Sequence, residues 1–210
     1  MSNLPTTLPI LPFSGALLLP RARLPLNIFE PRYLALVEDA LSAGRLLGMV
    51  QPQDLLKKPS LYKVGCAGRI ISFSETDDGR FLIVLQGVSR FAVGEEIATT
   101  RGYRRIVPDW QGYESDINET EEGLEPHLRD AVIDAIKPYF KMQGMVANWD
   151  TIEESTPERL ISSIIAICPF ADNEKQALLE APAFADRVQL LLTLLAMAVR
   201  QQPNLELARH

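Results

Sequence analysis

The stretch of residues 61–93 constrains the fold of this chain more than any other, because it is typical of two β-strands joined by a tight turn. Residues 70–73 and 81–85 are rich in Ile, Val, Leu and Phe, and the polar sequence Glu-Thr-Asp-Asp-Gly lies between them. Asp-Gly between two such runs favours a β-hairpin, since both residue types tolerate the positive φ that a short hairpin turn requires. The sequence therefore predicts an antiparallel hairpin at this point.

Further short strands are predicted on both sides of the hairpin. Residues 8–13 and 45–52 before it, and residues 103–110 after it, are short apolar runs. Many short strands at this spacing are typical of a β-barrel or a β-sandwich. One helix interrupts them between Pro31 and Gly44, where apolar residues recur at helical spacing and the glycine acts as a stop signal. Its apolar face is predicted to comprise Leu34, Val37 and Leu41.

The chain is expected to divide into two subdomains of different class. Residues 1–110 form the β-rich part, and residues 126–210 have apolar side chains at helical spacing, which predicts a helical bundle. Residues 111–125 contain many carboxylates and few apolar side chains, and we interpret them as an acidic, solvated linker. These regions together predict an α+β protein with an N-terminal β-rich part followed by a C-terminal helical bundle.

The composition is that of a globular protein in water, with 47% hydrophobic and 23% charged residues in a chain of 210. The longest apolar stretch, Leu190–Val199, is shorter than the roughly 20 residues that cross a bilayer, so we interpret it as a buried helix and expect no membrane partner. Prolines interrupt the start of the chain, which lacks the pattern of a secretion signal. We therefore expect a cytoplasmic protein.

The charge is distributed unevenly along the chain. Residues 1–109 contain 13 Lys or Arg and 10 Asp or Glu, whereas residues 110–210 contain 8 and 17, and the net charge is −6. Proteins that hold nucleic acid usually carry a dense basic surface, so this balance argues against nucleic acid as the main partner.

Neither a metal site nor a cofactor is expected. The two cysteines, Cys66 and Cys168, lie far apart among apolar neighbours, which is typical of buried reduced thiols. The two histidines, His127 and His210, are too few to complete a Cys/His cluster at zinc-binding spacing.

The common catalytic motifs are absent from the sequence. It contains no G-x-x-x-x-G-K-[ST] phosphate loop, no G-x-G-x-x-G dinucleotide fingerprint and no G-x-S-x-G nucleophile elbow. A hydrolase with an unrecognised site around Ser14 or His127 is an alternative, but no converging set of catalytic groups surrounds either residue in the sequence. We therefore expect the protein not to be an enzyme.

The sequence Phe-Glu-Pro-Arg-Tyr at residues 29–33 supports two interpretations. In the structural one, which we favour, Pro31 occupies the first turn of the helix and the charge of Glu30 complements the helix N-terminus. In the functional one, an exposed aromatic and guanidinium patch binds an extended peptide. The candidate substrate-binding residues are then Phe29, Glu30, Arg32 and Tyr33.

A second binding hypothesis concerns RNA. Arg101, Arg104 and Arg105 surround Tyr103, and basic residues interleaved with an aromatic ring are typical of RNA-binding surfaces. Because the chain is acidic overall, we expect this cluster to be a solvated strand edge and keep RNA as the alternative partner.

Several segments in a fixed order carry a family resemblance. They are LPILPF, PLNIFEPRYLALVEDAL, GRLLGMVQP and LYKVGCAGRIISFSETDDGRFLIVLQGVSRF, then PF-x(3)-EKQALLE at residues 169–180 and a long Leu-rich helix. In this order they resemble the N-terminal substrate-binding domain of ATP-dependent Lon proteases. The similarity begins at about Leu8, extends to the last helix, and is closest to stand-alone bacterial Lon-domain proteins.

The resemblance implies a PUA-like pseudo-barrel with one helix, followed by a helical bundle. It implies a role in holding unfolded or extended protein segments, which a separate protease or chaperone would then receive. Because PUA-like barrels in other families bind RNA, it also keeps the RNA alternative open. The chain stops at His210 with neither a phosphate loop nor room for a peptidase domain. We therefore expect binding without ATPase or protease activity, and the sequence predicts no oligomeric state.

Overall fold

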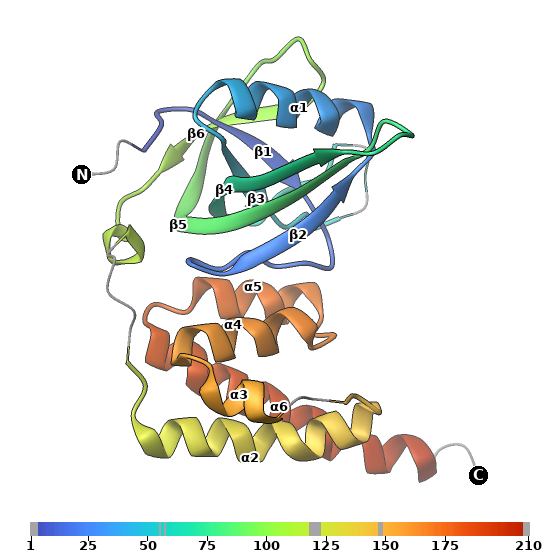
Figure 1. Ribbon diagram of the computed structural model, residues 1–210. Helices are drawn as coiled ribbons and strands as arrows, with labels where there is room; N and C mark the ends of the chain where they lie inside the picture. Colours follow the sequence, from blue (N-terminus) through green and yellow to red (C-terminus); the bar gives the residue numbers. More distant parts are fainter. Residues whose placement is uncertain (1–3, 55, 57, 118–122, 147–148, 208–210) are drawn as a thin grey trace. The chain divides into compact units, whose positions relative to one another are not determined.

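The computed structural model of the protein describes residues 4–54, 56, 58–117, 123–146 and 149–207, and these form two compact units. The first unit contains the described residues up to 117 together with Ala171–Leu179, and the second contains the remaining helical segments. Figure 1 follows the chain from the strands, in blue and green, to the helices, in yellow to red. The protein is of the α+β class, as the sequence predicts.

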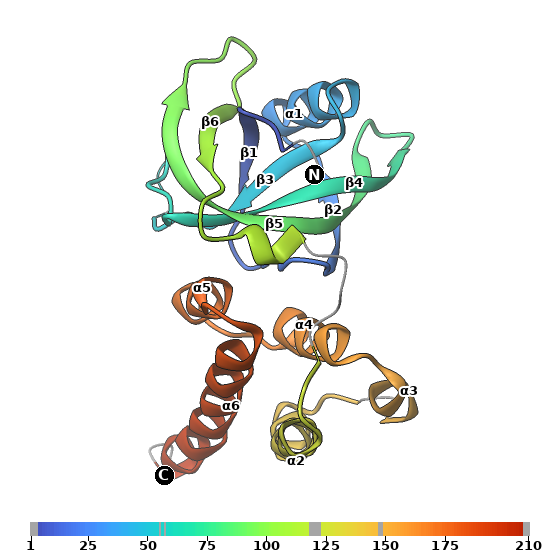
Figure 2. The ribbon, with the colours of Figure 1, turned by 90° about the vertical axis from the view of Figure 1, so that its left-hand side faces the viewer.

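Six strands in the described part of the chain form one mixed sheet. They are β1 (Leu8–Pro12), β2 (Arg23–Ile28), β3 (Leu46–Val50), β4 (Val64–Glu75), β5 (Phe81–Ile97) and β6 (Arg104–Asp109). The strand order is β2-β5-β4-β3-β1-β6, and β5 also pairs with β6, so that five of the strands close into a ring (Figure 2). β1 and β3 are parallel, and the other pairs are antiparallel.

The predicted hairpin is confirmed as β4 and β5. Glu75 pairs with Phe81 next to the turn, and the Thr76 amide donates to the Arg80 carbonyl at 2.9 Å. Gly79 has a φ of +78°, a conformation that glycine adopts without steric cost. Alternate residues of β5 are buried from Phe81 onward, because one face of the hairpin packs into the interior of the ring.

The interior of the ring is a small apolar core. Its buried residues are Leu8, Ile10, Leu46, Val50, Ala67, Phe91 and Ile106, and Trp110 packs against them from the rim. The ring of Phe91 meets the indole of Trp110 edge to face, with 5.7 Å between the centroids.

Helix α1 (Pro31–Ser42) begins as the sequence predicts, with Pro31 in the first turn, where its missing amide hydrogen costs nothing. It ends at the Ala43 cap, next to Gly44 with a φ of +90°. Of the predicted apolar face, Val37 is buried, whereas Leu34 and Leu41 are only half-buried. The buried face is instead Tyr33, Leu36, Val37 and Ala40.

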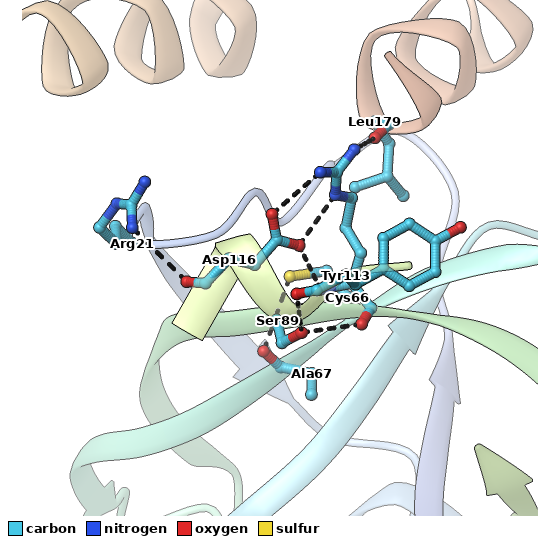
Figure 3. A network of polar contacts seen from close by, with 8 residues as sticks. Arg21, Cys66, Ala67, Ser89, Tyr113, Asp116 and Leu179 are labelled. Carbon is cyan, nitrogen blue, oxygen red and sulfur yellow. Dashed lines mark hydrogen bonds and ion pairs between the residues drawn. The ribbon is translucent and has the colours of Figure 1, made fainter. Parts of the chain in front are cut away.

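The acidic segment after β6 differs from the predicted solvated linker. Its first part forms a short 3-10 helix, η1 (Glu114–Ile117), in which Asp116 is only 8% exposed. Figure 3 shows the reason, because the carboxylate of Asp116 accepts hydrogen bonds from Arg90 Nε at 2.8 Å and Arg90 Nη2 at 2.9 Å. The linker interpretation is therefore wrong for Asp116, and residues 118–122 lie outside the described part.

Helix α5 (Asp172–Glu180) also departs from the predicted division, because most of it belongs to the first unit. Polar contacts hold it there: Lys175 Nζ donates to the Gly15 carbonyl at 2.7 Å, and Gln176 Nε2 donates to the Val64 carbonyl at 3.0 Å. Arg90 Nη1 donates to the carbonyl of Leu179 at 3.3 Å. Helical spacing predicts this helix but does not indicate which unit it joins.

The second unit consists of helices. These are α2 (Pro126–Gln143), α3 (Trp149–Glu154), α4 (Pro157–Ile167) and α6 (Phe184–Leu207), and α6 packs against α2 and α4. Their buried side chains include Val132, Ile136, Tyr139, Leu160, Ile164, Val188, Leu191 and Leu195. Across the described residues, no helix combines the length and hydropathy that spanning a membrane requires.

Candidate binding site beside helix α1

A pocket of about 700 Å³ lies in the first unit, where the start of α1 meets the connection between β5 and β6. This connection passes beside α1 in Figures 1 and 2. Volumes of about 300–1,000 Å³ are usual for small-molecule binding sites. We call it the α1 pocket, and its lining is Pro12, Arg32, Tyr33, Lys58, Pro59, Glu96, Ile97, Ala98, Thr99, Gly102, Tyr103 and Arg104.

Arg32 and Tyr33 form the α1 side of the pocket. Tyr33 is 8% exposed, its hydroxyl donates to the Pro12 carbonyl at 3.5 Å, and the Arg32 guanidinium lies 4.5 Å from the centroid of its ring. Glu30 fixes the guanidinium from the other direction, because its Oε2 accepts from Arg32 Nε at 3.0 Å and from Nη2 at 2.8 Å. Stacking and a charge-assisted hydrogen bond thus hold Arg32 in one orientation at the pocket.

The electrostatics keep the Tyr33 hydroxyl protonated. Burial raises the pKa of Tyr33 above its usual value, Glu30 adds to the increase, and the positive charges of Arg32 and Arg104 oppose it. The Tyr33 hydroxyl is therefore a neutral donor at physiological pH, with no chemistry beyond hydrogen bonding.

Arg104, Lys58 and Glu96 form the opposite side. Arg104 Nε and Nη2 donate to Glu96 Oε1 at 3.3 Å and to Oε2 at 3.0 Å, and Arg104 Nη1 donates to the Pro59 carbonyl at 2.7 Å. Lys58 Nζ lies 3.1 Å from the same carboxylate. Although burial raises the pKa of Glu96, the hydrogen bonds that Arg104 and Lys58 donate outweigh it and hold that pKa below its ordinary value.

The other arginines near Tyr103 are engaged as well. Arg101 Nη2 contacts Glu38 Oε2 at 2.6 Å, and its Nη1 contacts Asp39, which also accepts from the Tyr103 hydroxyl at 2.6 Å. Arg105 donates to Thr7 Oγ1 at 3.1 Å. Each of the three arginines proposed for RNA therefore has a protein partner, and the charges of Arg101 and Arg104 are compensated by carboxylates, which leaves less charge for a phosphate backbone.

The four candidate residues are not placed alike. Arg32 and Tyr33 line the pocket, and Glu30 joins it through its bonds to Arg32. Phe29 is 65% exposed and lies outside the lining, just before α1. Pro31 has the structural role predicted for it, so the structural interpretation holds for the backbone while the side chains of Arg32 and Tyr33 face a pocket.

Several pocket residues had no sequence signal. Among them, Lys58 comes from the segment before β4, and Glu96 and Ile97 come from the end of β5, which also pairs with β6. The register pairs Glu96 with Ile106 across a bulge, which periodicity cannot reveal. Glu96 on β5 and Arg104 on β6 form an ion pair between paired strands. The two residues would have indicated this side of the pocket only if the pairing of β5 with β6 had been known.

The two residues considered for catalysis belong to different units. Ser14 is an exposed loop residue of the first unit, and His127, in the second unit, has Glu125 Oε2 3.1 Å from its Nδ1. Within the described residues, no group of three or more His, Cys, Asp or Glu side chains is arranged to hold a metal ion. Cys66 and Cys168 are both buried, as predicted, and neither belongs to a disulfide.

Comparison with known proteins gives the family. The family model of the ATP-dependent protease La (LON) substrate-binding domain matches residues 7–197, so the chain belongs to the LON substrate-binding domain family. Among curated proteins, Lon protease 2 of Sorangium cellulosum is 30% identical over 205 residues, covering 93% of this chain and 25% of that protein. The Lon protease of Dictyoglomus thermophilum is 28% identical over 195 residues, covering 89% of this chain and 24% of that protein. The chain thus spans about a quarter of the length of these relatives.

Solved structures show the same fold. A Lon N-terminal domain protein from Xanthomonas campestris superposes with a TM-score of 0.59 at 25% identity, covering 91% of this chain and 98% of that one. The N-terminal domain of a Mycobacterium avium complex Lon protease superposes with a TM-score of 0.58 at 14% identity, covering 93% of this chain and 98% of that one. The resemblance stated from the sequence motifs is therefore confirmed.

Proposed function

We propose that this chain is a non-catalytic module that binds unfolded or extended protein segments, and that Phe29 and the α1 pocket form its binding surface. One observation carries this proposal: an exposed Phe29 lies three residues before an Arg32 that is held in place over the ring of Tyr33. Aromatic and arginine side chains are enriched at the energetic centres of protein interfaces. A pre-oriented guanidinium also loses less conformational entropy on binding than a mobile one.

Each candidate residue has a distinct role in this proposal. Phe29 supplies apolar area, Arg32 donates hydrogen bonds to carbonyl or carboxylate oxygens of the segment, and Tyr33 forms the apolar floor. Glu30 is a positioning residue, since both of its hydrogen bonds go to Arg32.

Family membership supports the proposal that the ligand is a protein segment. The matched family is described as a substrate-binding domain, and the relatives that share it are named Lon proteases. We propose that the segment held here passes to a separate protease or chaperone, without a cofactor. The ring of five strands supports our further interpretation of the first unit as a PUA-like pseudo-barrel, with the helices of the second unit as a bundle.

Binding of a fluorescently labelled, reduced and alkylated model protein tests this function. We expect saturable binding, and Phe29→Ala or Arg32→Ala should weaken it about tenfold, the loss typical of an interface hot spot. Ile167→Ala controls for loss of an exposed apolar side chain, because Ile167 is 50% exposed in the other unit. Arg80→Ala controls for loss of an exposed arginine, because Arg80 pairs with Asp78 at the same 2.8 Å as Arg32 pairs with Glu30. Absence of binding at millimolar concentrations would refute the proposal.

The RNA alternative is less well supported, because Arg101 and Arg104 are already paired with Glu38 and Glu96. RNA binding that weakens steeply with salt, and that disappears in Arg104→Ala and Arg105→Ala, would favour it over protein binding. We expect no such binding.

A further inference from the structure

The charges around the α1 pocket do not cancel. Arg32, Lys58 and Arg104 supply three positive charges, and Glu30 and Glu96 supply two negative ones. Glu96 is shared, since both Lys58 and Arg104 contact it. The surroundings of the pocket therefore carry one uncompensated positive charge.

Of the three basic residues at the pocket, Arg32 and Lys58 are the more exposed, and both have hydrogen-bond donors left for a ligand. Arg32 donates from Nε and Nη2 to one oxygen of Glu30, and among the described residues its Nη1 has no partner. Lys58 contacts Glu96, its one partner within the described part of the chain, and its side chain is 72% exposed. Arg104, by contrast, uses Nε, Nη1 and Nη2, and its side chain is only 20% exposed.

Most of the remaining lining is apolar or aromatic, and the hydroxyl of Thr99, its polar side chain, donates to the Tyr103 carbonyl. Pro12, Tyr33, Pro59, Ile97 and Tyr103 contribute hydrocarbon and ring surface. The Tyr33 and Tyr103 hydroxyls already donate to Pro12 and Asp39, so their rings rather than their polar ends remain for a ligand. Such a site fits an apolar side chain next to a single negative charge.

We propose that the α1 pocket selects segments carrying a carboxylate beside an apolar or aromatic residue, with Arg32 and Lys58 binding the carboxylate. This inference rests on the proposed function and specifies its ligand. A cation is disfavoured because Glu96, the carboxylate of the lining, already contacts both Lys58 and Arg104. One surplus positive charge matches a carboxylate, which carries a single negative charge, better than a phosphate with its charge near −2. The carboxylate comes either from an Asp or Glu side chain or from the C-terminus of a chain.

Three labelled peptides distinguish these sources. The first two are acetylated and amidated nonapeptides of Gly and Ser with a central Leu-Phe-Glu or Leu-Phe-Gln, and the third ends in Leu-Phe-Gln with a free carboxylate. Anisotropy titrations of the full chain at low salt should give about tenfold tighter binding for the Glu peptide than for its Gln counterpart, as expected for a charge-assisted hydrogen bond. The third peptide shows whether a C-terminal carboxylate serves as well.

Variants assign the preference to the pocket. Arg32→Gln and Lys58→Gln should remove most of the Glu over Gln preference and leave binding of the Gln peptide nearly unchanged, whereas Arg80→Gln should preserve the preference. Raising the salt concentration should reduce it, because exposed charges are screened. Equal affinity for all three peptides would overturn the carboxylate assignment and leave protein binding standing. Failure of every peptide and of the unfolded protein to bind would overturn both proposals.

Discussion

Asp116 accepts two parallel hydrogen bonds from Arg90, at 2.8 and 2.9 Å, in a place where the two side chains are only 8% and 4% exposed. The Arg90 amide donates to the same carboxylate at 2.9 Å. Burial lowers the pKa of Arg90, but the hydrogen bonds and charge of Asp116 outweigh it, so that this pKa lies above its ordinary value. The pair joins β5 to η1, and through Leu179 to α5 (Figure 3).

Removing Asp116 should destabilise the first unit strongly. Asp116→Ala leaves the Arg90 guanidinium buried without its counter-charge, which typically costs about 3–5 kcal/mol. Urea unfolding followed by Trp110 fluorescence in a Trp149→Phe background measures this unit alone, because the two tryptophans lie in different units.

Asp78→Ala is the matched control, since it removes an arginine-paired carboxylate whose side chain is 58% exposed. It should cost much less stability than Asp116→Ala, because solvent screens an exposed pair and removal of one partner leaves no buried charge behind. Equal effects of Asp116→Ala and Asp78→Ala would show that the buried pair does not hold the unit together.

Gly87→Ala should disrupt the connection between β2 and β5. A Cβ on Gly87 would lie 1.9 Å from the Leu19 carbonyl oxygen, and that backbone is fixed by the Arg21 amide, which donates to the Gly87 carbonyl at 2.9 Å. We expect a loss of about 3 kcal/mol or more, at the upper end for overpacked sites. Gly123→Ala has no atom within 4 Å of its new Cβ and should leave the urea midpoint unchanged. A Gly87→Ala midpoint within error of the parent would contradict the close approach.

The Glu96 carboxylate should make stability depend on pH. Because its pKa is lowered on folding, its contribution is present above the unfolded value near 4.5 and is lost as the pH falls through the lower folded pKa. The difference in urea midpoint between the parent and Glu96→Gln should therefore be constant near neutrality and shrink below about pH 4.5. A difference that stays constant into strong acid would show that Arg104 and Lys58 do not favour the ionised form of Glu96.

Asp78 offers a direct titration in the hairpin turn. Hydrogen bonds from Arg80 and then Thr76 lower the pKa of its carboxyl from 3.8 to about 2. An NMR titration of the side-chain carboxyl carbon should show this midpoint, and Arg80→Ala should raise it toward 3.8. A midpoint near 3.8 in the parent chain would mean that the turn does not hold these contacts in solution.

Most of the strands and helices were predictable because their signals are local, although β2 was not among the predicted strands. Asp78-Gly79 lies between alternating apolar residues, and Pro31 and Gly44 mark the two ends of α1. Backbone propensity and periodicity depend on neighbours within a few residues, so they can be read along the sequence.

The pocket and the buried pair depend instead on contacts between distant residues. Arg32 lines the same pocket as Tyr103 and Arg104, which the pairing of β6 with β5 holds in place. Asp116 lies in a run of carboxylates that is typical of a solvated linker. It is buried because it pairs with Arg90, which lies 26 positions earlier in the sequence. Which charged side chains form ion pairs therefore depends on the strand pairing, which local sequence patterns do not reveal.

The most direct test of the binding surface is an NMR titration of the ¹⁵N-labelled full chain with the unlabelled, reduced and alkylated model protein. We predict that the backbone amide shifts of residues 29–34 and 96–104 change progressively, and that Arg32→Ala suppresses the changes while Arg80→Ala does not. Saturable binding that leaves both segments unperturbed would contradict the assignment of this surface.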